Sequence, residues 1–234
     1  MAPEQGVAVV ADGMGGHPGG DVASRIAAET AAKVLREAVG AGLVGDSETH
    51  LRAAMARSVV AAHDAIRAHG RDDPELAGMG TTLTAMIVDA PAARYVLGHV
   101  GDSRAYLFRD ERLTQLTRDD TWVQERVEAS QLTPEQARRH PFGHLLTQCL
   151  GLDDPPIPHI LGGRVEAGDA FLLCTDGLVG MLEDEEMERI LAEHLAPNAG
   201  PHDAEAPVRA LLDAANEAGG YDNITAALLR PSRD

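Results

Sequence analysis

Two apolar runs of this chain each end on an Asp-Gly pair. Residues 7–11 (VAVVA) precede Asp12, and residues 171–175 (FLLCT) precede Asp176. An Asp-Gly pair taken alone is most often an ordinary turn. Because both pairs terminate apolar runs, we interpret each run as a buried strand that delivers one carboxylate to a shared edge. The glycine lets the backbone turn sharply and lets a carbonyl oxygen approach a ligand without a side chain in the way.

Two further acids stand in similar settings. Asp102 lies in the sequence VGDSR, and Asp222 lies in GGYDNIT. Four carboxylates at strand ends suit hard cations, because Mg²⁺ and Mn²⁺ prefer oxygen ligands in octahedral geometry and are held by few carboxylates. Two such ions bridged by one carboxylate can share a water, lower its pKa and direct it at phosphorus. The four acids therefore predict a site for divalent cations.

Other phosphate-handling motifs fit the sequence poorly. The glycine-rich segment 13–20 follows a predicted strand and precedes a predicted helix, as dinucleotide loops do. However, Pro18 stands where the Gly-x-Gly-x-x-Gly pattern needs its last glycine. The single lysine of the chain, Lys33, lies inside a predicted helix, which excludes a Walker loop and argues against Schiff-base chemistry.

Nucleophilic and zinc hydrolases are also disfavoured, because the chain has no Gly-x-Ser-x-Gly elbow and no His-Glu-x-x-His motif. We expect Ser103 to be a structural hydroxyl. His17 lies beside the proposed site and could donate a proton to a leaving group, although an imidazole in a glycine-rich loop is more often solvated. His140 and His144 are expected at the surface.

The composition bounds the class of protein. The 234 residues are enough for a sizeable core, and no long Pro/Ser linker divides them, so we expect one domain. The 20 basic and 37 acidic residues give a net charge of −17, which argues against nucleic acid or an anionic membrane as the main partner. Cys149 and Cys174 lie in apolar stretches and are expected to be reduced core residues.

The N-terminal segment has no basic region, and the apolar stretch after it is too short for a signal sequence or a membrane span, so we expect a soluble, cytoplasmic protein. Aromatic residues make up only 3% of the chain, so the core must consist of Ala, Val, Leu and Ile. Such a core favours helices that pack closely on sheets.

Hydrophobic periodicity and turn signals predict two early helices, a strand-rich middle and a mixed C-terminal part. The predicted helices are 22–39, with Asp21 as its N-cap, 48–68, 184–194 and 206–217. The predicted strands are 6–11, 81–88, 93–100, 104–108, 112–116, 157–165, 170–175 and 224–229. The charged segment 118–145 between them carries Thr133-Pro134-Glu135, a helix start, and we expect Trp122 to anchor this segment to the body of the domain.

Six motifs, in order along nearly the whole chain, resemble the bacterial branch of the PP2C-type (PPM) metal-dependent protein serine/threonine phosphatases. They are VVADGMGGH at 9–17, GTTLT at 80–84, VGDSRAY at 100–106, LLTQCLG at 145–151, LLCTDGL at 172–178 and GGYDNIT at 219–225. The resemblance implies an α+β fold, namely a four-layer αββα sandwich of two antiparallel sheets flanked by helices. It implies a single domain over residues 1–234, with a flap at about 118–145 that influences substrate choice.

The resemblance also implies a binuclear Mg²⁺ or Mn²⁺ site. Asp12 would bridge the two ions, the carbonyl of Gly13 would hold the second ion, and Asp176 and Asp222 would complete the first. Asp102 together with Asp176 would offer a weaker third site.

In enzymes of this kind, the catalytic acids at the positions of Asp12, Asp176 and Asp222 support in-line attack on phosphorus by a metal-bridged water, without a phosphoenzyme. Asn223 and His17 would support the site. The implied partners are phosphorylated proteins, namely substrates of a eukaryotic-like Ser/Thr kinase, and the protein is expected to be a monomer that binds neither nucleic acid nor membrane. Phosphorylated antagonists of anti-sigma factors are a further substrate class open to this fold.

The chain departs from the family pattern in two places. Family members usually carry further strands before the first Asp-Gly, with an arginine that grips the phosphate, whereas eleven residues without arginine precede Asp12 here. In the flap, Asp119-Asp120-Thr121 replaces an Asp-His-Ser-like turn, and Gly143-His144 stands where Arg-Asn is common. The alternative to an active phosphatase is therefore a catalytically weak or inactive PP2C-like regulatory or binding module.

Overall fold

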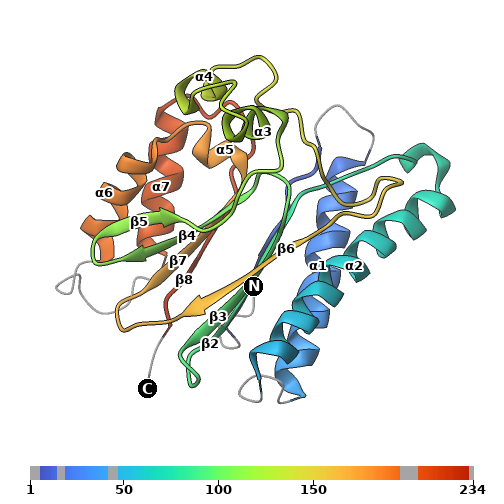
Figure 1. The fold of residues 1–234 in the computed structure, drawn as a ribbon, viewed down its shortest axis with the longest axis horizontal. Helices are drawn as coiled ribbons and strands as arrows, with labels where there is room; N and C mark the ends of the chain where they lie inside the picture. Colours follow the sequence, from blue (N-terminus) through green and yellow to red (C-terminus); the bar gives the residue numbers. More distant parts are fainter. Residues whose placement is uncertain (1–5, 15–18, 42–46, 196–204, 232–234) are drawn as a thin grey trace.

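Two four-stranded antiparallel sheets lie face to face between two groups of helices in the computed structural model (Figure 1). The structure describes residues 6–14, 19–41, 47–195 and 205–231. The strand orders are β1-β2-β3-β6 and β5-β4-β7-β8. This arrangement confirms the predicted fold class, an α+β sandwich of antiparallel sheets flanked by helices.

The elements follow one another much as the sequence predicts. The first sheet contains β1 (Val7–Val10), β2 (Leu83–Asp89), β3 (Arg94–Val100) and β6 (His159–Arg164). The second contains β4 (Arg104–Arg109), β5 (Arg112–Gln115), β7 (Ala170–Cys174) and β8 (Ala226–Leu229). The helices are α1 (Gly20–Gly40), α2 (Glu48–Asp72), the short η2 (Pro74–Leu76), α3 (Trp122–Glu128), α4 (Pro134–Arg138), α5 (Asp176–Val179), α6 (Asp184–Leu195) and α7 (Ala206–Glu217).

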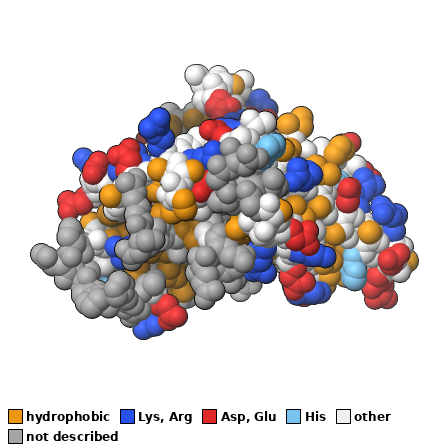
Figure 2. Space-filling model, turned by 90° about the horizontal axis from the view of Figure 1, so that it is seen from below, with side chains coloured by type: hydrophobic (Ala, Val, Ile, Leu, Met, Phe, Trp, Pro, Cys, Tyr) orange, Lys and Arg blue, Asp and Glu red, His pale blue; other side chains and the backbone are white. Residues whose placement is uncertain are grey.

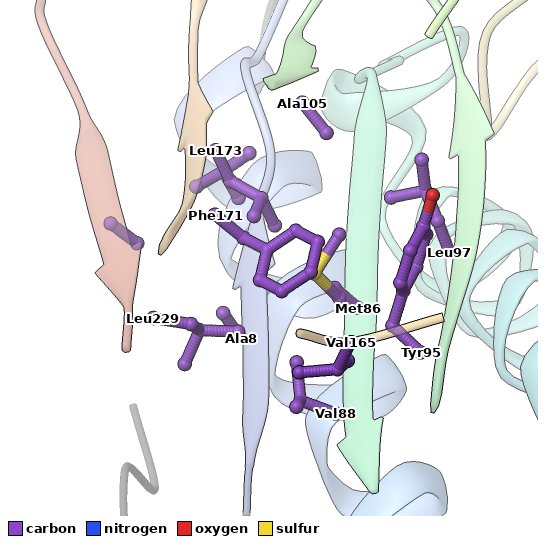
Figure 3. Packing of buried hydrophobic residues seen from close by; sticks show 12 residues of the cluster. Ala8, Met86, Val88, Tyr95, Leu97, Ala105, Val165, Phe171, Leu173 and Leu229 are labelled. Carbon is purple, nitrogen blue, oxygen red and sulfur yellow. The ribbon is translucent and has the colours of Figure 1, made fainter. Parts of the chain in front are cut away.

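The strands in the middle of the sandwich are apolar on both faces because both faces are covered. Along β7, Phe171 and Leu173 point into the space between the sheets, and the alternate residues point toward α6 and α7. Figure 3 shows the Phe171 ring near Met86 of the other sheet. The rings of Tyr95 and Phe171 lie 4.9 Å apart between their centroids. This packed layer between the sheets fixes the position of β1 relative to β7.

The early helices cover the outer face of the first sheet. The buried residues of α1 recur at intervals of three or four positions: Gly20, Ala23, Ala27, Ala31, Leu35 and Ala38. These small side chains allow close packing, as expected from the low aromatic content. The expectation that Asp21 caps this helix is wrong. The N-cap is Gly19, in the left-handed region at φ 80°, and Asp21 lies in the first turn, where its charge favours the helix dipole.

The flap, residues 118–145, has an aromatic cluster of its own. Trp122 lies against His140 and Phe142, with ring centroids 5.2 Å and 5.8 Å away, and Arg126 lies 5.1 Å over its ring. These partners belong to the flap, so the ring contacts of Trp122 support the flap itself, and its role as an anchor to the body of the domain stays a prediction. Thr133 forms the predicted helix start, with a complete capping box.

The surface carries mixed charge despite the acidic composition. On the face seen from below, acidic and basic side chains alternate around the outline, with apolar side chains between them (Figure 2). Both cysteines are free and buried, as predicted, and burial raises the pKa of the Cys149 thiol to about 11. Within the described residues, no helix is both long and apolar enough to cross a membrane.

Candidate metal centre

All four predicted aspartates lie at one end of the sandwich. Asp12 follows β1, Asp102 lies in the turn from β3 to β4, Asp176 begins α5 directly after β7, and Asp222 precedes β8. The antiparallel registers bring these strand ends together, since β1 pairs with β2, and β7 lies between β4 and β8. The four side chains line one cleft of about 1040 Å³. Gly13 and Asn223 line the same cleft.

A network of hydroxyl groups fixes the backbone of Asp12. The N–H of Asp12 donates to Thr82 Oγ1 at 2.9 Å, and its carbonyl accepts from Thr81 Oγ1 at 2.7 Å. Thr82 Oγ1 in turn lies 2.7 Å from the buried Ser103 Oγ, beside Asp102. Ser103 is therefore a structural hydroxyl, as predicted, and it links the turn that carries Asp102 to the segment that carries Asp12.

The glycines of the two Asp-Gly pairs allow other backbone segments to approach closely. A Cβ on Gly13 would lie 2.0 Å from the carbonyl oxygen of Gly20, at the start of α1. A Cβ on Gly177 would lie 2.3 Å from the carbonyl oxygen of Asn223. Gly177 is thus the second residue of α5, packed against the loop that carries Asp222, and not simply a turn residue.

The electrostatics of the cleft oppose full ionisation of the acids. Burial raises the pKa of Asp12 to about 8, reinforced by the nearby carboxyl group of Asp176 and by the charges of Asp102 and Asp222. Burial raises the pKa of Asp102 to about 7, reinforced by the charges of Asp176 and Asp119. Among the described residues that line the cleft, there is no lysine or arginine. Positive charge from elsewhere is therefore needed to ionise all four acids at neutral pH.

The donor set suits a hard divalent cation. Asp176 Oδ1 is buried and has no hydrogen-bond partner in the described structure, an arrangement that costs free energy unless a cation or other donor satisfies it. In the described part of the chain, no three His, Cys, Asp or Glu side chains form a ready-made cage around one point. Mg²⁺ and Mn²⁺ do not require one, because each keeps several waters and takes one or two carboxylates.

The structure places only some of the supporting residues predicted from the sequence at the cleft. Asn223 is exposed on the rim of the cleft, and its N–H donates to Asp222 Oδ1 at 2.7 Å. Asp222 is likewise exposed. His17 lies outside the described residues. Of the two flap histidines expected at the surface, His144 is exposed and also lines the cleft, whereas His140 is half-buried against Trp122.

Sequence reasoning missed the role of Asp120, which joins the flap to the metal-site turn. Its carboxylate is fully buried and accepts from the N–H of Gly101 at 3.0 Å, one residue before Asp102. Its other carboxylate oxygen lies 2.8 Å from His159 Nε2, 3.3 Å from Gln148 Nε2 and 3.4 Å from Arg118 Nη1. The presence of Asp120 in the unusual Asp119-Asp120-Thr121 turn could have indicated this role. Its hydrogen-bond partners, however, lie up to 39 positions away in the sequence, so local patterns do not identify them.

Comparisons with known proteins agree with this site. Residues 2–214 match the family model described as Protein phosphatase 2C. The chain is 38% identical over 216 residues to the serine/threonine protein phosphatase PstP of Mycobacterium tuberculosis, covering 92% of this chain but only 38% of that protein. It is 34% identical over 227 residues to the serine/threonine phosphatase stp of Listeria monocytogenes, covering 96% of this chain and 84% of that protein.

Solved structures give the same result. A crystal structure of the catalytic domain of PstP in complex with two manganese ions superposes with a TM-score of 0.75 at 36% sequence identity, covering 96% of this chain and 88% of that one. The resemblance found in the six sequence motifs is therefore confirmed by the family model, by relatives and by structure.

Proposed function

Because the chain belongs to the protein phosphatase 2C family, we propose that it is a metal-dependent phosphatase that removes phosphate from phosphoserine and phosphothreonine side chains of proteins. One observation carries this proposal furthest. The four predicted aspartates line a single cleft whose described lining holds no lysine or arginine, and one of their oxygens is buried without a hydrogen-bond partner in the described structure. Such a cleft repels a phosphate dianion unless divalent cations occupy it.

We propose unequal roles for the acids. Asp12 bridges two Mg²⁺ or Mn²⁺ ions, the Gly13 carbonyl supports the second ion, and Asp176 and Asp222 complete the first. Asp102 with Asp176 offers a weaker third position. When bound, the ions supply Lewis-acid activation of water and neutralise charge on the phosphoryl group.

The surrounding residues position these acids. Thr82 accepts a hydrogen bond from the Asp12 N–H and Thr81 donates one to the Asp12 carbonyl, so the backbone that carries this carboxylate is already fixed before substrate binds. The tight contact between Gly177 and Asn223 sets Asp222 beside Asp176. Asn223 supports the site at its rim. We assign to His17 the donation of a proton to the leaving group.

The same proposal covers organisation and partners. Residues 1–234 form one phosphatase domain, with the flap as part of it. The substrates are cytoplasmic phosphoproteins modified by a eukaryotic-like Ser/Thr kinase, and the protein acts as a monomer. Relatives whose names describe them as serine/threonine phosphatases support the substrate class.

The proposal is tested by Mn²⁺-dependent hydrolysis of an aryl phosphate and of a phosphothreonine peptide. We expect Asp176→Asn to lower kcat/KM for both substrates by roughly a hundredfold or more, because it removes a ligand charge at the reacting centre. The matched control is Asp21→Asn, since Asp21 is an exposed acid in the first turn of α1 that is not among the residues lining the cleft. Equal rates for the wild type and Asp176→Asn would instead favour the alternative, a weak or inactive binding module.

A further inference from the structure

Three large apolar side chains are exposed on the walls of the cleft that holds the acids. Leu145 is 48% exposed, Leu152 is 39% exposed, and Ile157 is 77% exposed. We call these three residues the apolar wall. Single exposed apolar residues are common on protein surfaces, but a group of them beside a polar cleft marks a binding surface.

The loop that carries most of the apolar wall is held in place from several sides. Arg67 of α2 donates to the carbonyl of Asp153 at 2.7 Å and to its Oδ1 at 3.1 Å. At the other end of the loop, the N–H of Ile157 donates to Gln148 Oε1 at 2.8 Å. Two prolines at positions 155 and 156 restrict the backbone between these ties. Ile157 is therefore presented to solvent by an ordered loop, which lowers the entropy cost of binding a ligand there.

The charges of the cleft indicate what kind of ligand this surface accepts. Six aspartates line the cleft, namely Asp12, Asp102, Asp153, Asp154, Asp176 and Asp222, and its lining within the described residues includes no lysine or arginine. Asp153 is paired with Arg67. Asp154 also lines the cleft, in the same loop as Ile157. A polypeptide with apolar and basic side chains complements this wall, whereas an acidic one is repelled.

We propose that the apolar wall binds the segment of the substrate protein that flanks the phosphorylated residue, with an apolar side chain against Ile157 and a basic side chain near Asp154. This inference rests on the proposed phosphatase function. The occupant is the substrate's own chain because the wall and the four metal-site acids belong to one continuous cleft. Loop 152–157 thus determines which substrate sequences the protein prefers, while the four metal-site acids determine the hydrolysis of the phosphate ester.

The test compares matched phosphothreonine peptides that carry Leu or Ser, and Lys or Glu, at the positions flanking the phosphothreonine. For the wild type, we expect kcat/KM to be about five- to tenfold higher with Leu than with Ser. Ile157→Ser should remove most of that preference and leave hydrolysis of an aryl phosphate unchanged. The control is Leu161→Ser, because Leu161 is also an exposed apolar residue, with 39% of its surface exposed, but lies on β6, outside the cleft lining.

Two results separate this inference from the proposed function. An undiminished Leu preference in Ile157→Ser, with normal hydrolysis, overturns the role of the apolar wall and leaves the phosphatase intact. If the wild type hydrolyses no phosphate ester with Mn²⁺, the proposed function fails. The Kd values of the unphosphorylated Leu and Ser peptides, measured by fluorescence anisotropy, then decide the inference. A preference for Leu that Ile157→Ser abolishes supports it, and equal Kd values overturn it.

Discussion

Burial of Asp12 and Asp102, reinforced by charge repulsion among the four cleft aspartates, makes the cation-free protein sensitive to pH. The ordinary pKa of an aspartate is near 4 in an unfolded chain, whereas the folded values are about 8 for Asp12 and about 7 for Asp102. Between pH 4 and 8 the folded state therefore holds protons that the unfolded state has released. The stability associated with these groups is complete below about pH 4 and is lost as the pH rises through 7 to 8.

We accordingly expect the Tm of the cation-free protein to fall between pH 5.5 and pH 8, and Mn²⁺ to raise the Tm more at pH 8 than at pH 5.5, because the ion competes with protons for the acids. Asp12→Asn should flatten the decline with pH and reduce the Mn²⁺ effect. Thermal denaturation at several pH values measures both changes. Because the whole protein is acidic, Asp21→Asn serves as the control for net charge. Identical pH profiles for the two variants would contradict this account.

The acids of the site could be predicted from sequence because each lies next to an apolar run or a strand-edge turn. The groups that position them could not. Thr82 reaches Asp12 across 70 positions, and the contact of Gly177 with Asn223 depends on how two loops meet. Local patterns carry no information about such pairs. The sequence therefore indicates which acidic side chains line the cleft, but not which residues hold those side chains in position.

At the scale of elements, strands and helices follow from hydrophobic periodicity, and the errors occur where a local signal competes with a distant partner. β2 begins at Leu83, two residues later than predicted, because Thr81 and Thr82 bond instead to Asp12. α2 continues to Asp72, four residues beyond its predicted end. Trp122 finds aromatic partners 18 and 20 positions away inside the flap. Each of these outcomes depends on tertiary contacts.

The attachment of the flap depends on Asp120. We expect Asp120→Asn to lower the free energy of unfolding by about 1.5–3 kcal/mol, the usual worth of a hydrogen-bonded buried charge, and to speed amide exchange in residues 121–147. Asparagine can still accept from Gly101 but cannot pair with Arg118 and His159 as an ion. Hydrogen exchange read by mass spectrometry measures the local effect.

The control for the flap is Glu128→Gln. Glu128 pairs with the same Arg118, but its side chain is 45% exposed, so its removal should cost much less. If both variants loosen the flap equally, then Arg118 and not Asp120 is the residue that holds it.

At the scale of the whole molecule, the site spans both sheets. Asp12 extends from the first sheet and Asp176 from the second, so the packing between the sheets sets the separation of the two carboxylates. Phe171 lies in this packing layer, fully buried beside Tyr95 and Met86. Protein interiors are close-packed and transmit a change in volume to neighbouring elements. The spacing of the proposed metal ligands is therefore coupled to the core between the sheets.

Phe171→Ala tests this coupling. It should lower the free energy of unfolding by about 3–5 kcal/mol, and it should also weaken Mn²⁺ binding. Leu172→Ala is the matched control, because Leu172 is equally buried on the same strand but faces α6 and α7; we expect a cost of about 2–5 kcal/mol with Mn²⁺ affinity nearly unchanged. Urea unfolding gives the stabilities, and calorimetric titration with Mn²⁺, at a temperature where both variants are folded, gives the affinities. Equal weakening of Mn²⁺ binding would mean that the site responds to overall stability and not to the spacing of the sheets.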